Sequence, residues 1–244
     1  MLVQTGLLCG VVTMRLLDLF CGAGGAAMGY SRAGFTEIIG VDNRPQSHYP
    51  FTFVQADALE YVAEHGHKFD AIHASPPCQA YSVMRNLPWL QHRDYPTLLL
   101  PVSQKLRALN KPYVIENVMG VSDNSRNLVK FGLVSHGLSA GFLCGLMFGK
   151  TFFRHRLFAT NWLWLAPGHP NHNEITHSPL YVRNRSVGAL SMYSRRDEVQ
   201  HVKGYRLASL KMGINWMNYA ELCQAIPPVY TEFIGKSLLG ALES

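Results

Sequence analysis

Short apolar runs, each closed by a glycine or a polar residue, recur through the first half of the chain. We expect buried strands at 15–20, 38–41, 51–54, 70–74 and 113–115, with helices at 26–33, 58–65 and 98–109. Strands that alternate with helices predict an α/β fold with a doubly wound, mostly parallel sheet. Because ligands of such sheets bind outside the carboxyl ends of the strands, the residues that follow each run form the candidate site.

The pattern changes from about residue 162 to residue 203, where helical periodicity is weak and histidine, arginine, asparagine and serine are frequent. This composition predicts an insertion of loops and short strands. Regularity returns at 205–212, then Asn218-Tyr219-Ala220-Glu221 predicts a capping box, and Pro227-Pro228 begins a last helix at 229–242. We therefore expect a main domain at 14–161, an insertion at 162–203 and C-terminal helices at 204–244 that return to the main domain.

Composition and charge narrow the class of protein. The 244 residues are 48% hydrophobic and only 16% charged, which predicts a full core rather than disorder. A formal charge of +6 favours a polyanionic partner. The five cysteines are odd in number and form no CxxC pair, which argues for a reducing compartment and against a disulfide scaffold.

The N-terminal segment carries no targeting signal that we can identify. Its longest apolar stretch, 7–13, is too short to span a membrane and follows no basic residue. We therefore expect a cytoplasmic protein without a membrane partner. Residues 1–13 precede Met14 and the first predicted strand, so we also expect them to be dispensable.

The stretch Ser75-Pro76-Pro77-Cys78-Gln79 places a cysteine directly after a predicted strand. Each proline fixes its own φ and biases the residue before it to extended geometry, so the backbone at Cys78 is stiff. A rigidly held thiol suits a nucleophile, because attack depends on near-attack geometry. A buried structural cysteine is the alternative interpretation.

A glycine-rich loop follows the first predicted strand. Gly22-x-Gly24-x-x-Ala27 fits the dinucleotide fingerprint, and Asp42 lies close to the distance expected for a ribose-binding carboxylate. The loop indicates an adenosine-type cofactor, and on this motif alone an NAD enzyme is an open alternative.

Four motifs follow one another along the chain, namely Asp18-Leu19-Phe20-Cys21-Gly22-Ala23-Gly24-Gly25, Pro76-Pro77-Cys78-Gln79, Glu116-Asn117-Val118 and Arg154-His155-Arg156. In this order they resemble the motifs of the DNA cytosine-C5 methyltransferases. The stretch at 224–235 resembles the version found in the small phage-type members of that family. The resemblance covers 15–160 and resumes at about residue 204. It implies a Rossmann-like fold, S-adenosylmethionine as cofactor, double-stranded DNA as partner, a monomer, and the cytoplasm of a bacterial or phage-infected cell.

The resemblance also implies roles for individual residues. Cys78 would attack cytosine C6, Glu116 would hold the N3/N4 edge and supply a proton at N3, and Arg156, helped by Arg154, would grip the O2 side. A base in a duplex must be flipped out to reach such a pocket. The implied cofactor residues are Phe20, Gly22, Gly24, Gly25, Asp42, Asp57 and Pro76.

The insertion stands where the family has its target-recognition region, so we expect it to contact DNA. At roughly 40 residues it can present few base-reading side chains. The candidate DNA contacts are Gln79, Ser82, Arg183, Arg185, Arg195 and Arg196. His169, His172 and His177 suggest zinc, but three histidines without a fourth nearby ligand are more typical of solvated or phosphate-facing side chains, so we predict no metal.

Two positions depart from the family pattern. Phe152 stands where a polar residue is usual, and Cys223-Gln224 stands where a Gly-Asn pair is expected. Neither change touches the nucleophile. Two further alternatives stay open, namely the same chemistry on tRNA and a methyltransferase-like domain that holds DNA without turnover, although intact Cys78, Glu116 and Arg156 argue against the latter. The NAD alternative does not explain the Pro-Pro-Cys-Gln and Glu-Asn-Val motifs.

Overall fold

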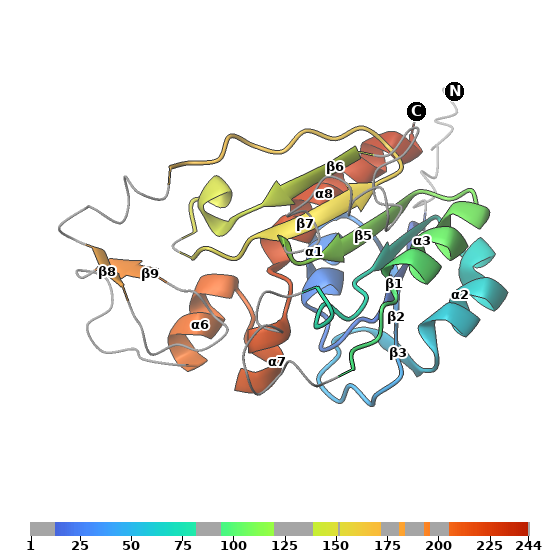
Figure 1. Ribbon diagram of the computed structural model, residues 1–244, viewed down its shortest axis with the longest axis horizontal. Helices are drawn as coiled ribbons and strands as arrows, with labels where there is room; N and C mark the ends of the chain where they lie inside the picture. Colours follow the sequence, from blue (N-terminus) through green and yellow to red (C-terminus); the bar gives the residue numbers. More distant parts are fainter. Residues whose placement is uncertain are drawn as a thin grey trace, which may run out of the picture.

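The structure is a computed structural model in which residues 13–81, 94–119, 139–150, 152–171 and 205–243, with the backbone of 181–183 and 193–195, are described. Its main element is a seven-stranded sheet with the order β3-β2-β1-β4-β5-β7-β6 (Figure 1). The strands are β1 (Arg15–Leu19), β2 (Glu37–Asp42), β3 (Thr52–Gln55), β4 (Ala71–Ala74), β5 (Tyr113–Asn117), β6 (Ser139–Leu143) and β7 (Arg156–Thr160).

The first five strands are parallel, and they confirm the predicted α/β sheet. The strand order reverses at β1, which pairs with β2 on one side and with β4 on the other. Ligands of doubly wound sheets bind at such a switch point, outside the carboxyl ends of the strands. The loops that follow β1 and β4 are therefore adjacent at the edge where the glycine and Pro-Pro-Cys motifs were expected.

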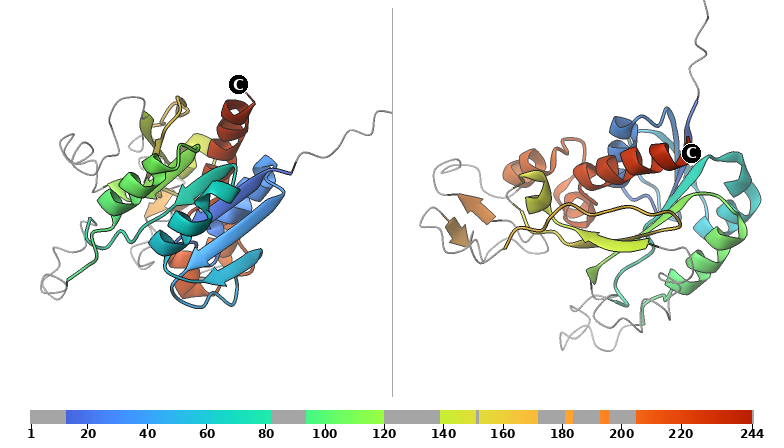
Figure 2. Two further views of the ribbon diagram at one scale, coloured as in Figure 1. Left: turned by 90° about the vertical axis from the view of Figure 1, so that its right-hand side faces the viewer. Right: turned by 90° about the horizontal axis from the view of Figure 1, so that it is seen from above.

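Helices cover both faces of the sheet, as the two further views show (Figure 2). Helices α1 (Gly25–Ala33) and α8 (Pro228–Leu242) pack together on one face, while α2 (Ala58–His65) and α3 (Leu99–Ala108) cover the other. Each face has its own apolar core, with Tyr30 and Tyr230 buried in the first and Phe69 in the second. The α1–α8 contact is close because Gly29 has no side chain, and Thr231 Oγ1 donates to Ala26 O at 2.9 Å.

The antiparallel edge of the sheet was not located by the sequence pattern. Strand β7 runs antiparallel to both β5 and β6, and the turn after β6 contains the 3-10 helix η4 (Gly145–Phe148). Strand β7 begins at Arg156, so Arg154 precedes the strand, and its side chain is buried.

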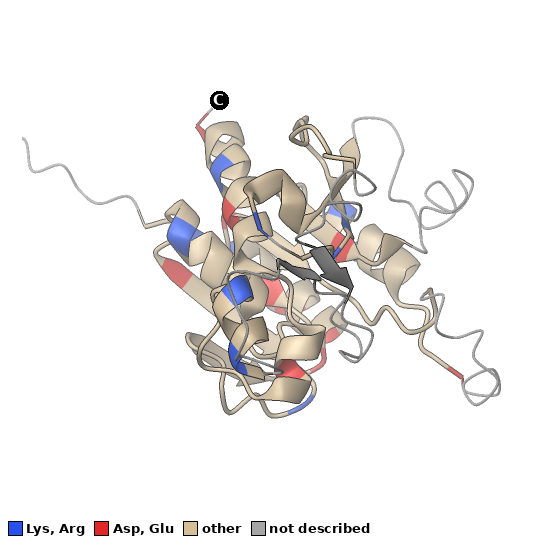
Figure 3. Ribbon diagram, turned by 90° about the vertical axis from the view of Figure 1, so that its left-hand side faces the viewer, with Lys and Arg blue, Asp and Glu red and all other residues tan. Residues whose placement is uncertain are grey.

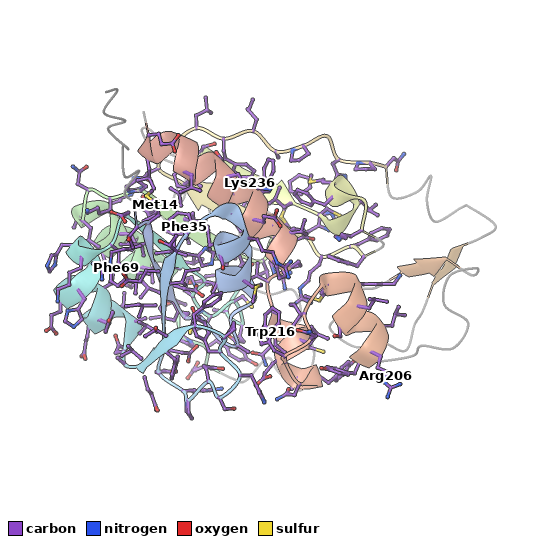
Figure 4. The ribbon with its side chains drawn as sticks, turned by 180° about the vertical axis from the view of Figure 1, so that it is seen from behind. Met14, Phe35, Phe69, Arg206, Trp216 and Lys236 are labelled. Atoms are coloured by element: carbon purple, nitrogen blue, oxygen red, sulfur yellow. The ribbon has the colours of Figure 1, made fainter. Side chains whose placement is uncertain are left out.

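The C-terminal elements largely match their predicted bounds. Helix α6 covers Tyr205–Met212, and α7 (Tyr219–Gln224) begins with a capping box in which Asn218 and Glu221 exchange side-chain contacts with the opposite backbone N–H. Trp216, labelled in Figure 4, lies between these helices, and its indole N–H donates to Ala23 O in the glycine loop at 2.8 Å. The C-terminal segment thus returns to the glycine loop of the main domain.

Within the predicted insertion, β8 (Tyr181–Arg183) and β9 (Tyr193–Arg195) form a separate antiparallel pair. The proposed boundaries at 162 and 203 stay a prediction. Residues 1–12 lie outside the described residues, so the expectation that 1–13 are dispensable is also untested. No helix in the described part of the chain is both long and apolar enough to cross a membrane.

Candidate functional site

The glycine loop after β1 combines left-handed backbone with close packing. Phe20, Gly22 and Gly24 have φ values of +57°, +48° and +81°, a region that favours glycine. A Cβ on Gly24 would lie 2.6 Å from Pro50 Cδ, and one on Gly25 would lie 2.5 Å from Ile226 O. A Cβ on Gly22 would meet no atom of the protein within 4 Å, so the space beside this residue can admit a ligand.

Two acidic residues stabilise the loops around this space. Asp42 Oδ2 accepts a hydrogen bond from Gly22 N at 3.1 Å, and its Oδ1 accepts one from Arg44 N at 3.0 Å. Asp57 caps α2, because its Oδ1 accepts from Leu59 N at 2.8 Å and from Glu60 N at 3.0 Å. A carboxylate has further lone pairs, so both residues can still receive hydroxyl or amino groups from a ligand.

Two buried pairs of hydrogen-bonded side chains, Asp18–Tyr49 and Tyr30–His73, lie within the core near the glycine loop. Asp18 is fully buried and accepts a hydrogen bond from Tyr49 Oη at 3.2 Å, and burial raises its pKa to about 8. His73 on β4 is paired with Tyr30 at 2.9 Å, and burial lowers its pKa to about 3. The sequence does not reveal these contacts, since buried polar residues within apolar strands form no distinct pattern.

The Pro-Pro-Cys loop is tied to both neighbouring strands. Ser75 N donates to Leu19 O and Ser75 Oγ donates to Phe20 O, both at 3.2 Å. Asn117 Nδ2 at the end of β5 donates to Pro76 O at 3.0 Å. Pro76 is buried, Cys78 is half-buried and Gln79 is exposed, so the loop holds a partly accessible thiol on a fixed backbone.

An ion pair between a half-buried arginine and a buried glutamate lies beside the thiol. Arg156 Nε is 3.0 Å from Glu116 Oε1, and the Arg156 guanidinium also donates to His155 O at 2.9 Å. Burial raises the pKa of Glu116 to about 7, although Arg156 and Arg154 oppose the shift. Among the described residues, no hydrogen bond of good geometry satisfies Glu116 Oε1. The protein therefore does not use all the lone pairs of this buried oxygen.

The electrostatics of Cys78 place it in the same cluster. Burial raises the pKa of its thiol, Glu116 raises it further, and Arg156 and Arg154 lower it. The structure thus brings together all four residues to which the sequence assigned catalytic roles, Cys78, Glu116, Arg154 and Arg156. The roles themselves stay predictions.

Arg154 is bound from the C-terminal segment. Its Nη2 donates to Cys223 O at 2.6 Å, and Tyr230 Oη donates to Arg154 O at 2.8 Å. Because the acceptor at Cys223 is a main-chain oxygen, the departure from a Gly-Asn pair leaves this contact intact. The other departure, Phe152, is buried in the core beside α8. Burial lowers the pKa of Arg154 to about 9.

The predicted DNA contacts are only partly within the described residues. Gln79 is exposed beside the thiol, whereas Ser82, Arg185 and Arg196 lie outside the described residues. Arg183 and Arg195 lie on β8 and β9, of which only the backbone is described, and each is paired with a tyrosine of the other strand. On the described ribbon, basic positions are interspersed with acidic ones (Figure 3).

Comparisons with known proteins agree with this geometry. The sequence profile of the C-5 cytosine-specific DNA methylases matches residues 14–137, just over half of the chain. The chain is 25% identical over 187 residues to the Type II methyltransferase M.AgeI of Thalassovita gelatinovora, covering 65% of this chain and 42% of that protein. It is 28% identical over 123 residues to M1.HphI of Haemophilus parahaemolyticus, covering 44% of this chain and 33% of that one. The chain thus spans less than half the length of these curated relatives.

Two solved structures share the fold. One is described as a DNA modification methyltransferase encoded within an E. coli prophage, with a TM-score of 0.61, 16% identity and coverage of 95% of this chain and 100% of that chain. The other is the Dnmt2 methyltransferase of S. pombe, with a TM-score of 0.60, 15% identity and the same coverage. From the profile match, which includes the glycine, Pro-Pro-Cys and Glu-Asn-Val motifs, the chain belongs to the C-5 cytosine-specific DNA methylase family.

Proposed function

We propose that this protein transfers a methyl group from S-adenosylmethionine to C5 of cytosine in DNA. One observation carries the proposal. The half-buried thiol of Cys78 lies close enough to the buried carboxyl group of Glu116 for that group to raise the pKa of the thiol, and Glu116 Oε1 lies 3.0 Å from Arg156 Nε. Nucleophile, acid and cation are the three groups that methylation of a cytosine ring requires.

The residues of the glycine loop fit the proposed cofactor. The space beside Gly22 is open, the Asp42 carboxylate borders it, and Phe20 stands at the start of the loop with a half-buried ring. Asp42 would bind the ribose hydroxyl groups, Phe20 would stack on the adenine and Asp57 would accept from its amino group. The cofactor, when bound, supplies an electrophilic methyl group.

Cys78 provides the electron pair that makes C5 reactive. Its thiolate adds to cytosine C6, and the electrons of the C5–C6 double bond move toward C5, which then takes up the methyl group. Solvent water then takes the C5 proton and N3 returns its proton to Glu116, which re-forms the C5–C6 double bond and releases the thiolate. Because burial and Glu116 both raise the pKa of the thiol, protonation of the Glu116 carboxylate or its pairing with the base favours the thiolate.

Glu116 is the acid of the proposed reaction. A pKa of about 7 keeps a large part of the carboxyl groups protonated at neutral pH, so Glu116 can donate a proton to cytosine N3 as the thiolate attacks. Arg156, 3.0 Å from Glu116, would then bind the O2 side of the ring. Arg154, whose Nη2 is bound to Cys223 O, holds the C-terminal segment against this site and adds positive charge.

Access to the pocket requires a base outside the helical stack, so we infer that the target cytosine is flipped out of the duplex. Sequence choice would then belong to the insertion at 162–203, with Arg183, Arg185, Arg195 and Arg196 as candidate readers of bases or holders of phosphates. Gln79 and Ser82, next to the nucleophile, are candidate contacts to the nucleotides around the flipped base.

The test is nucleoside analysis in a host without cytosine methylation of its own. Expression of the chain is expected to produce 5-methyl-2′-deoxycytidine in digested DNA, whereas Cys78→Ser, which keeps the size but loses the thiol, is expected to produce none. Purified protein should also form a covalent adduct with a duplex that carries 5-fluorocytosine, and not with the unsubstituted duplex. Methylation of RNA alone, or turnover by Cys78→Ser, would overturn the proposal.

A further inference from the structure

Three metal-ligating side chains meet at the β6 edge of the sheet, and no role proposed above uses them. Cys144 directly follows β6, His155 directly precedes β7, and His169 lies in the segment after β7. One ligand atom from each residue lies within 4.8 Å of the others. Cys144 is buried, His155 is half-buried and His169 is exposed, so the cluster opens to solvent on one side.

The spacing of these atoms is close to that of a tetrahedral zinc site. The Nε2 atoms of His155 and His169 are 3.2 Å apart. Two nitrogens bound to one zinc ion at about 2.0–2.1 Å are about 3.3 Å apart, and a bound sulfur lies about 3.6 Å from each nitrogen. The nitrogen pair already has this separation, and the limit of 4.8 Å on the three ligand atoms exceeds the bound sulfur–nitrogen distance by about 1 Å.

The surrounding packing holds the ligands in place. The Phe142 ring lies 5.6 Å from the His155 ring and 5.3 Å from the His169 ring, measured between centroids. The segment that carries His169 runs back along β6 and α8, as the views in Figures 1 and 2 agree. Trp162 Nε1 donates to Ser237 Oγ on α8 at 3.1 Å, and Trp164 packs on Gly141 of β6. The contacts of Trp162 and Trp164 therefore hold the segment that carries His169 near Cys144 and His155.

We propose that Cys144, His155 and His169 bind a zinc ion, with a fourth position open to solvent or to another ligand. On binding, the Cys144 thiol releases its proton to solvent and coordinates as the thiolate, while both histidines coordinate as neutral imidazoles. A hydrogen bond between the two histidines is the metal-free alternative, in which the Cys144 sulfur keeps its hydrogen bonds with the backbone N–H groups of Leu146 and Arg154. Such N–H groups also stabilise a thiolate, so they are compatible with a metal-bound sulfur. The site differs from the His169, His172 and His177 set that the sequence suggested. His172 and His177 lie outside the described residues.

The ion would tie the segment leading into the insertion to the catalytic edge of the sheet. His155 stands between Arg154 and Arg156, and His169 is near the start of the 162–203 insertion. A zinc ion that joins them would fix where this segment leaves the main domain. The ion would have a structural role, so its removal should make this segment more flexible without unfolding the sheet.

Metal titration with spectroscopy tests the proposal. The purified full chain is freed of metal and titrated with Co²⁺, which reports tetrahedral coordination by visible d–d bands and a thiolate ligand by a near-ultraviolet charge-transfer band. Zinc affinity is then measured by competition. Each chain is expected to bind one ion. Two variants serve as controls and should bind zinc as the wild type does. His67→Ala changes an exposed histidine that is distant in sequence from the three proposed ligands, and Cys78→Ala removes the proposed nucleophile.

Cys144→Ser is expected to abolish the charge-transfer band, and His169→Ala is expected to weaken zinc binding by at least about tenfold, because each removes one of three ligands. If the buried Cys144→Ser change prevents folding, the exposed His169 decides the matter. His169→Cys should restore binding and strengthen the charge-transfer band. Absence of tight binding by the wild type, unchanged binding by His169→Ala, or loss of binding by Cys78→Ala would overturn the proposal.

Discussion

The two sides of the candidate site are built from different kinds of contact. On the side that we propose binds the cofactor (the cofactor side), between β1 and β3, the fixed elements are backbone conformations and main-chain hydrogen bonds, such as the left-handed Gly24 and the Asp42 contact to Gly22 N. On the side that we propose binds the target base (the base side), between β5 and the C-terminus, they are charged side chains brought together from distant segments. Glu116, Arg156 and Arg154 form this group.

This difference determines what a substitution does on each side. The cofactor side depends on shape, so a single added methyl group should change packing or block a ligand. The base side depends on the balance of buried charges, so an isosteric change that removes one charge should alter the chemistry while leaving the fold in place.

The largest effect is expected on the base side. Glu116→Gln keeps the shape of the side chain but removes the proton that the carboxyl group can donate, so the rate of methylation should fall by about 10²- to 10⁴-fold. The fold should persist, because the amide still fits the site beside Arg156. Single-turnover methylation of a DNA duplex measures the rate, and thermal unfolding checks the fold.

The pH profile distinguishes loss of an acid from loss of structure. In the wild type, the rate should rise with pH as the Cys78 thiolate forms and should level off near pH 7, where Glu116 loses its proton. In Glu116→Gln the low rate should continue to rise through pH 7, since no carboxyl group titrates there. An identical break in both proteins would show that Glu116 is not the acid.

The same contrast explains what could be predicted from the sequence. The elements on the cofactor side can be predicted from neighbouring residues. An apolar run followed by Gly-x-Gly indicates β1 and its loop, and Asp57 directly precedes α2. The antiparallel β6 edge carries no such signal. Its small and aromatic residues (Ser139, Gly141 and Phe142) lack the uniform apolar run of a buried strand.

Contacts between distant segments are the other feature that could not be predicted from the sequence. The Arg154 contact to Cys223 O spans 69 residues, and its acceptor is a main-chain atom that the side-chain pattern does not record. The buried pairs Asp18–Tyr49 and His73–Tyr30 were missed for a related reason, because polar residues inside apolar strands do not show where their partners are. The family motifs supplied the order of the site residues, and the fold supplied their proximity.

A smaller effect, on stability, is expected from alanine substitution of two glycines in the glycine loop, Gly22 and Gly24, which serve as a matched pair. Gly24→Ala should destabilise the fold by about 2–4 kcal/mol, because φ is +81° and the new Cβ would lie 2.6 Å from Pro50 Cδ. For a chain of this size, the melting temperature should fall by roughly 5–15 °C. Gly22→Ala should cost only about 1–2 kcal/mol, since its Cβ would enter open space.

Gly24→Ala should lose more stability, whereas Gly22→Ala should lose more ligand affinity. Gly22→Ala is expected to weaken the binding of S-adenosylhomocysteine by at least about tenfold, which corresponds to about 1.4 kcal/mol, because the new methyl group would occupy space meant for the ligand. Calorimetry with this compound and with NAD measures the effect. Unchanged affinity in Gly22→Ala, or tight binding of NAD alone, would contradict the cofactor assignment.

The smallest effect concerns the buried carboxyl group beneath that loop. Asp18 has a pKa of about 8 in the folded protein, well above the value of about 4 in an unfolded chain, so the folded state binds the proton more tightly. Its contribution to stability is fully present below about pH 4 and is lost as the pH rises toward 8. Asp18→Asn cannot titrate, so relative to this variant the wild type should lose on the order of 1–3 kcal/mol across that interval. Urea unfolding of both proteins at several pH values measures the difference, in which the opposite contribution of His73 cancels. A constant difference would mean that Asp18 ionises normally and that Tyr49, which packs on Gly24, stabilises its charged form.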